Sequence, residues 1–163
     1  MDQALDPVRS PAIEAFWRDF RAAGGPDHDA YEVVSFGDSP ALADELAELV
    51  LAGRKRATAF LARDMAAGAE TPTLGGHVVV VDGAGRPRLI WRTTELRIGP
   101  LISVDDAFAW DEGEGDRSRA HWLAEHRRYF ARQAARDGFA MHDGIEVVFE
   151  RFTVVWPPEA ADR

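Results

Sequence analysis

Leu51-Ala-Gly-Arg-Lys-Arg-Ala-Thr58 joins a predicted helix to a predicted strand. The helix begins at the pair Ser39-Pro40, a capping residue followed by one that suits a first turn, and Gly53 stands where a helix commonly ends. Residues 54–58 are therefore expected to leave the helix as an exit segment and to start a strand. This exit segment places a lysine and a threonine three residues apart, and its path determines what the two side chains can reach.

Other helices and strands are predicted from the same kinds of signal. One predicted helix begins at the Ser10-Pro11 cap and ends at Gly24-Gly25. A second covers 104–110 and follows a capping box of Ser103 and Asp106. A third begins at an Asp116 cap and runs to about residue 136, before Gly138. Residues 31–36 form a short apolar stretch. The predicted strands cover 78–81, 88–96 and 145–155, the last as one or two strands, and 64–76 is predicted to be a loop.

Short strands interrupted by helices, without regular alternation, favour an α+β domain over a doubly wound sheet. We expect a small, partly closed β-barrel with helices around it. The ends, 1–9 and 157–163, are expected to be loose.

The composition limits the possible function classes. The chain has 163 residues, 46% of them hydrophobic, which fits one soluble domain. It contains no cysteine, and this excludes disulfides, thiolate nucleophiles and cysteine zinc sites. Neither a membrane span nor a basic, apolar leader is evident, so a cytoplasmic location without membrane attachment is expected. The net charge of −9 disfavours a broad, charge-driven nucleic-acid binder, but the basic clusters at 54–56 and 117–136 leave a small anion or a short single strand possible.

Lys55 and Thr58 admit two interpretations. If the protein environment lowered the pKa of the amine, neutral Lys55 could take the hydroxyl proton as the Thr58 oxygen attacks a carbonyl. On a regular strand the two side chains would point to opposite faces, so this requires a bend at 56–57. The other interpretation is that the basic residues are solvated charges near a helix C-terminus and that Thr58 is an ordinary strand residue.

The stretch Glu112-Gly-Glu-Gly-Asp116 is predicted to be an acidic, glycine-rich loop. Glu112 could serve there as a general acid or base, and the glycines would let a substrate approach the backbone. With Asp111, Glu114 and Asp116 it could also bind a divalent cation, although the spacing does not match an EF-hand loop, and a solvated loop is the simplest alternative. His121 and His126 are five residues apart and do not match the spacing of paired metal ligands.

Tryptophans near the basic residues give a further possibility. Trp91 or Trp110 could stack on a nucleic-acid base beside Arg54 or Lys55, although tryptophans in such positions are more often part of the core.

Several motifs together resemble the ASCH domain family, which is related to the PUA fold. They are Phe36-Gly-Asp38, Leu51-Ala-Gly53, Lys55-Arg-Ala-Thr58, Ala109-Trp-Asp-Glu-Gly-Glu-Gly-Asp-Arg-Ser118, Trp122 and His126. The resemblance implies a β-barrel of about five or six strands and association with RNA or nucleosides. It divides the chain into an N-terminal helical extension packed on the domain (1–34), an ASCH domain (35–156) and a C-terminal tail (157–163).

Some small bacterial members of this family remove the acetyl group from acetylcytidine with a lysine, a threonine and a glutamate. The resemblance implies that Thr58 is the nucleophile, that Lys55 is the activating base and oxyanion partner, and that Glu112 is the proton donor. The candidate substrate-binding residues are Arg54, Arg56, Trp110, Glu114 and Arg117. No metal ligands and no cofactor are expected for this activity.

The extra length, the N-terminal helix and the acidic loop make the chain similar also to a longer ASCH subgroup, with a proposed ribonuclease activity on single-stranded RNA that a divalent metal could assist. A noncatalytic RNA-binding module is the third alternative. The expected partner is a nucleoside or single-stranded RNA, and the sequence indicates no protein partner.

Overall fold

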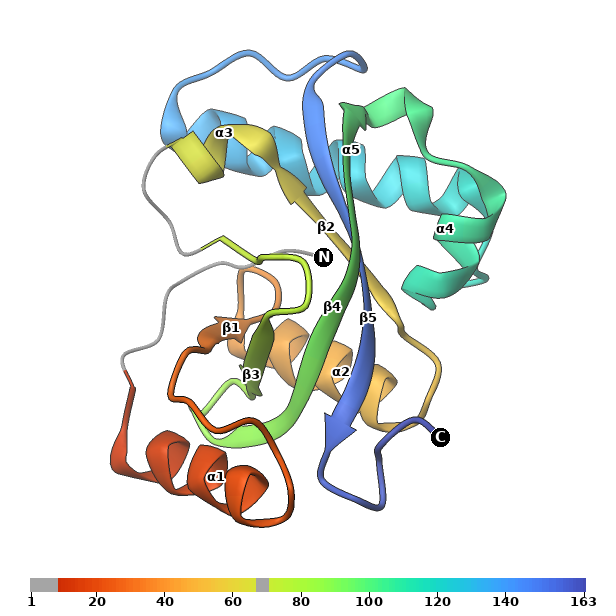
Figure 1. Ribbon diagram of the computed structural model, residues 1–163. Coiled ribbons are helices and arrows are strands. Elements are labelled where there is room, and N and C mark those ends of the chain that lie inside the picture. Colours follow the sequence, from red (N-terminus) through yellow and green to blue (C-terminus); the bar gives the residue numbers. More distant parts are fainter. Residues whose placement is uncertain (1–8, 67–70) are drawn as a thin grey trace.

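The computed structural model describes residues 9–66 and 71–163 and contains one five-stranded sheet with helices around it (Figure 1). The elements are α1 (Pro11–Ala22), β1 (Glu32–Ser35), α2 (Pro40–Leu51), β2 (Ala57–Leu61), α3 (Ala62–Ala66), β3 (His77–Val81), β4 (Pro87–Pro100), a 3-10 turn η1 (Leu101–Ser103), α4 (Asp106–Glu112), α5 (Arg119–Asp137) and β5 (Glu146–Trp156). The α+β class is therefore confirmed.

The sheet has the strand order β1-β3-β4-β5-β2. β1 and β3 are parallel and the other pairs are antiparallel. The sheet curls into a half-barrel about the two long strands β4 and β5, which cross the centre of Figure 1. β2 is an edge strand and pairs with β5, so the exit segment that precedes β2 is held against the middle of the fold.

Two hydrophobic clusters hold the helices to the sheet. In the smaller cluster, Ile13, Trp17 and Phe20 of α1 pack against Val33 of β1 and neighbouring strand residues. The larger cluster joins α2, α4 and α5 to the strands. In Figure 1, α1 lies near β1 and β3, whereas α4 and α5 lie on the side of β2 and the upper parts of β4 and β5.

Three local predictions are wrong. The helix α3 occupies the start of the predicted loop 64–76; residues 67–70 of that loop, with Gly68, lie outside the described residues. The N-cap of α4 is Asp105, which accepts from Phe108 N at 2.8 Å, because the Ser103 hydroxyl instead donates to Pro100 O. Ser118 caps α5, whereas Asp116 accepts from Ser118 N just before the helix.

The C-terminal tail is tied down rather than loose. The Asp162 carboxylate accepts hydrogen bonds from Val154 N at 2.9 Å and from Arg56 at 2.8 Å. Residues 1–8 of the other predicted loose end are outside the described part of the chain. Among the described helices, none has the length and apolar character needed to cross a membrane.

Candidate functional site

The exit segment and the acidic stretch meet through hydrogen bonds to backbone carbonyls. Arg56 N donates to Asp111 O at 2.6 Å, and the Arg54 guanidinium donates to Gly113 O at 2.6 Å and to Gly115 O at 2.5 Å. The end of α4 is therefore fixed to the residues that enter β2, and the two segments form one site.

Gly113 makes this approach possible. Its φ is +73°, and a Cβ atom there would overlap Arg54 O and lie 3.0 Å from the Lys55 Cα. The glycine accommodates protein backbone, so the prediction that it leaves room for a substrate is wrong. The prediction that Glu112 lies on a loop is also wrong, because Glu112 is the last residue of α4 and is buried.

Lys55 lies at the centre of the site. Its ammonium donates to Glu112 Oε2 at 2.9 Å and to Glu114 Oε2 at 3.2 Å, and the carbonyl of Glu112 is 3.5 Å away. The Lys55 and Glu112 side chains are both 0% exposed, whereas the Glu114 side chain is 13% exposed. The cluster thus has a dry centre and reaches solvent at Glu114.

The charges of this cluster stabilise one another in their ionised forms. Burial alone would lower the pKa of Lys55, but the Glu112 and Glu114 carboxylates outweigh it and raise the pKa above its usual value. Burial alone would raise the pKa of Glu112, but the Lys55 charge outweighs it and holds the pKa well below its usual value. Lys55 is therefore an ammonium and Glu112 a carboxylate. The lowered lysine pKa that a free base requires is not found.

His126 of α5 adjoins the carboxylates. Its Nδ1 lies 2.8 Å from Trp122 O, which can only accept, so Nδ1 carries a proton. Its Nε2 faces Glu112 Oε1 at 3.6 Å. One ligand atom each of Glu112, Glu114 and His126 lies within 4.8 Å of the others, so the three could hold a metal ion. The Lys55 ammonium already pairs with both carboxylates, and a metal ion there would have to displace it.

Thr58 lies on β2 directly opposite Glu150 of β5. Opposed residues of an antiparallel pair share a face of the sheet, with Cβ atoms about 5 Å apart. Thr58 is 5% exposed and Glu150 is 0% exposed. Lys55 precedes the strand, so the alternation expected for a regular strand does not separate it from Thr58. Within the described residues, no hydrogen bond joins Lys55 to Thr58.

Comparison with known proteins assigns the chain to a family. A model of the ASCH domain matches residues 32–156. The chain belongs to the ASCH domain family. Its structure is similar to that of an ASCH domain from Lactobacillus crispatus JV V101, with a TM-score of 0.81, 28% identity, and coverage of 88% of this chain and 94% of that chain.

A second similar structure is a protein from Enterococcus faecalis V583. It has a TM-score of 0.80 and 30% identity, and the match covers 88% of this chain and 87% of that chain. Among curated proteins, none matches this chain.

In this ASCH domain the arginines predicted to bind substrate have protein partners. Arg54 holds the end of α4, and Arg56 donates to Asp162 and to Val50 O. Arg117 donates to Trp110 O at 2.8 Å and stacks on the Trp110 ring at 3.9 Å. Trp110 itself is 57% exposed, so this stacked pair is open to solvent.

The acidic residues of the predicted loop separate into different roles. Glu112 and Glu114 face Lys55, but Asp111 pairs with Arg151 at 3.1 Å and Asp116 accepts from a backbone N–H. A cation bound jointly by all four acids is therefore excluded by their placement. Trp91, the other proposed stacking residue, belongs to the core, where it stacks on Phe152 at 3.9 Å.

Glu150 and His126 are members of the site that sequence reasoning did not assign to it. Glu150 is an acidic residue within the apolar run of β5, and that interruption is the signal that could have identified it. His126 was given no site role because its spacing from His121 does not match that of paired metal ligands. It is buried, and it faces Glu112.

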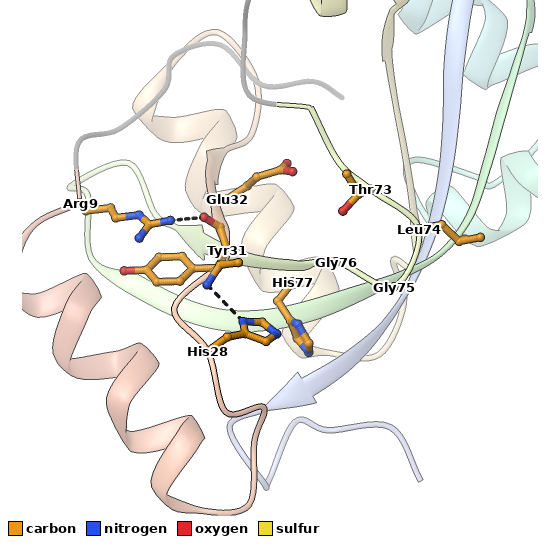
Figure 2. Close-up of a pocket in the computed structure, with 10 residues that line it drawn as sticks. Arg9, His28, Tyr31, Glu32, Thr73, Leu74, Gly75, Gly76 and His77 are labelled. Atoms are coloured by element: carbon orange, nitrogen blue, oxygen red, sulfur yellow. Dashed lines mark hydrogen bonds between the residues drawn. The ribbon is translucent and has the colours of Figure 1, made fainter.

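A separate pocket of about 520 Å³ lies at the opposite edge of the sheet from β2 (Figure 2). His28, Tyr31 and His77 line it, and Gly75-Gly76 form part of its wall. Arg9 reaches over the Tyr31 ring at 3.7 Å and donates to Tyr31 O. None of these residues belongs to the Lys55 cluster.

Proposed function

We propose that this ASCH domain binds a modified nucleoside and hydrolyses the acetyl amide of acetylcytidine at the Lys55 cluster. The observation that supports this most is the fully buried Lys55–Glu112 ion pair at 2.9 Å, whose lysine lies two residues before β2, the strand that carries Thr58. Strongly perturbed ionisable groups gather at functional sites more often than elsewhere.

In this proposal Thr58 is the nucleophile. Its oxygen attacks the acetyl carbon, and the hydroxyl proton passes to the Lys55–Glu112 pair as Lys55 gives a proton to Glu112. Lys55 remains an ammonium throughout and faces the oxyanion that forms on the acetyl oxygen. Its third N–H is suited to this role, because the protein acceptor nearest to it, Glu112 O, is 3.5 Å away.

The charge of the cluster favours a neutral base over a phosphate. Two carboxylates, Glu112 and Glu114, face the single ammonium of Lys55, so these three groups sum to −1. A phosphate diester would meet repulsion there, whereas a nucleobase with N–H groups can donate to Glu114. The exposed pair of Trp110 and Arg117 offers a stacking surface for the base.

The test is release of acetate from acetylcytidine by the purified protein and by three variants, Lys55→Met, Thr58→Val and Glu112→Gln. Each variant should lower kcat/KM by about 100-fold or more, the usual loss for such groups. Glu146→Gln is the matched control, because Glu146 is an exposed glutamate on β5. Wild-type turnover that survives in all three variants would refute the assignment, provided that their circular dichroism matches the wild type.

A metal-assisted ribonuclease is the second candidate, and the closeness of Glu112, Glu114 and His126 supports it. The test is cleavage of a labelled single-stranded RNA with added Mn²⁺ or with a chelator. Metal-dependent cleavage that is lost in His126→Ala would favour this candidate. Binding of cytidine without any turnover would favour the noncatalytic module.

A further inference from the structure

Glu150 is a buried carboxyl group in which one oxygen accepts hydrogen bonds and the other accepts none from the described residues. Its Oε2 accepts from the Thr93 hydroxyl at 2.7 Å and from Trp91 Nε1 at 3.3 Å. Its Oε1 is buried and has no hydrogen-bond partner among the described residues. Since two donors already occupy Oε2, a proton on this carboxyl group would reside on Oε1.

We propose that Glu150 is the general acid of the reaction and that Oε1–H protonates the departing nitrogen of the substrate. The inference rests on the proposed function, because it assigns a residue to that same site. Its geometric basis is the register of the sheet, which sets Glu150 directly opposite the nucleophile Thr58 on one face. A substrate whose acetyl carbon meets Thr58 can then place its nitrogen next to Glu150.

The environments of the two buried glutamates support this division of roles. Burial raises the pKa of Glu150 to about 7, and its hydrogen bonds with Thr93 and Trp91 and the field of Lys55 only partly oppose this. Glu112 is held as a carboxylate by Lys55 before the reaction, and the proton that it takes up in the first stage is the one that returns to Thr58 in the second. When the pKa values of two carboxyl groups in one site are shifted in opposite directions in this way, the group that stays neutral is the acid.

The groups that face Glu150 come from three segments. β4 contributes Thr93 and Trp91, β2 contributes Thr58, and the exit segment contributes the charge of Lys55. Of these, Lys55 alone is charged near neutral pH, and it stays protonated, so Glu150 is the one of these groups whose protonation changes near pH 7.

The reaction then balances in two stages. In the first, the C–N bond breaks, its electron pair goes to nitrogen, and nitrogen takes the Oε1 proton, which leaves an acetyl ester on Thr58 and a Glu150 carboxylate. In the second, water attacks the ester, gives one proton back to Glu150 and releases acetic acid. Thr58 recovers the proton held by the Lys55–Glu112 pair.

The test compares two acetyl donors on the unmodified protein. Acetylcytidine needs a proton on its leaving nitrogen, whereas the nitrophenolate of nitrophenyl acetate leaves without one. We expect kcat for acetylcytidine to fall about tenfold per pH unit above pH 7, and kcat for the ester not to fall. An identical pH profile for both donors, each corrected with Thr58→Val as the blank, would overturn the proposal.

The variant Glu150→Gln keeps an oxygen that can accept from Thr93 and Trp91 but cannot transfer a proton. We expect a loss of about 100-fold or more in kcat for acetylcytidine, with KM unchanged, whereas the first-stage burst of nitrophenolate from nitrophenyl acetate should be retained, because that stage needs no proton from Glu150. Glu146→Gln should match the wild type for both donors. A Glu150→Gln protein with full amide activity refutes the role of Glu150 alone, whereas a wild type without amide activity refutes the proposed function and this inference with it.

Discussion

Breaking the buried ion pair should destabilise the fold strongly, and Glu112→Gln is the most direct way to break it. The substitution keeps the size of the side chain and removes the charge that lies 2.9 Å from Lys55 Nζ. Removal of one partner from a buried pair destabilises a protein by about 3–5 kcal/mol, because the other charge is left without compensation. Glu114 remains 3.2 Å from the ammonium and retains part of the interaction. We therefore expect a loss near the lower end, about 3 kcal/mol.

Urea unfolding followed by tryptophan fluorescence measures this loss, since the chain has five tryptophans. With a slope of about 2 kcal/mol per M, the midpoint should fall by roughly 1.5 M. Glu114→Gln should have a smaller effect, about 1 kcal/mol, because its side chain is 13% exposed rather than buried.

The double variant Lys55→Met/Glu112→Leu separates the pair from its surroundings. Replacing both charges with apolar groups of similar size is often neutral or stabilising, so this variant should unfold within about 1 kcal/mol of the wild type. The coupling energy from the single variants Lys55→Met and Glu112→Leu and the double variant should exceed about 2 kcal/mol. Single variants as stable as the control Glu146→Gln would show that Lys55 and Glu112 do not form a buried ion pair, and the reasoning would fail.

Three other outcomes are expected. Glu150 binds its proton more tightly in the folded state, since its pKa rises from 4.5 to about 7. The stabilisation from this proton is therefore complete below pH 4.5 and is lost as pH rises through 7. The free energy of unfolding of the wild type, measured with urea, should fall by about 3 kcal/mol over that range relative to Glu150→Gln. The raised pKa of Lys55 means that its contribution is complete below pH 10.5 and is lost only above it, so the gap in stability between the wild type and Lys55→Met should close in strong alkali. Gly113→Ala should lower stability by about 1–3 kcal/mol in thermal melting, because a Cβ at this positive φ meets the backbone of Arg54.

The local signals of the chain predicted most of the fold. Ser10-Pro11 and Ser39-Pro40 begin helices as expected, and Gly138 ends α5. These features depend on neighbouring residues, so a sequence displays them directly. The cap of α4 was misassigned because Ser103 and Asp105 can both act as caps, and the choice depended on η1, which gives the Ser103 hydroxyl a carbonyl to bond.

The meeting of Lys55 with Glu112 was foreseen through the family pattern and not through local signals. The protonation state of Lys55 could not be foreseen. It depends on the direction in which the pKa shifts, and that direction is set by two carboxylates, more than fifty residues away in the sequence, which outweigh the effect of burial. Glu150 was missed for a related reason. Its partner Thr58 becomes adjacent only through the pairing of β2 with β5, and that register is a property of the whole sheet.

The cluster is better explained by function than by stability. A fold of this size can fill the space of Lys55 and Glu112 with apolar side chains at little or no loss of stability, since desolvation of two charges offsets most of their attraction. A second carboxyl group, Glu150, lies 0% exposed in the same region with an oxygen that bonds to nothing in the described chain. Stability and activity should therefore separate in Lys55→Met/Glu112→Leu, which is expected to unfold like the wild type and to release no acetate. A double variant that keeps both properties would show that the buried charges are incidental to the activity.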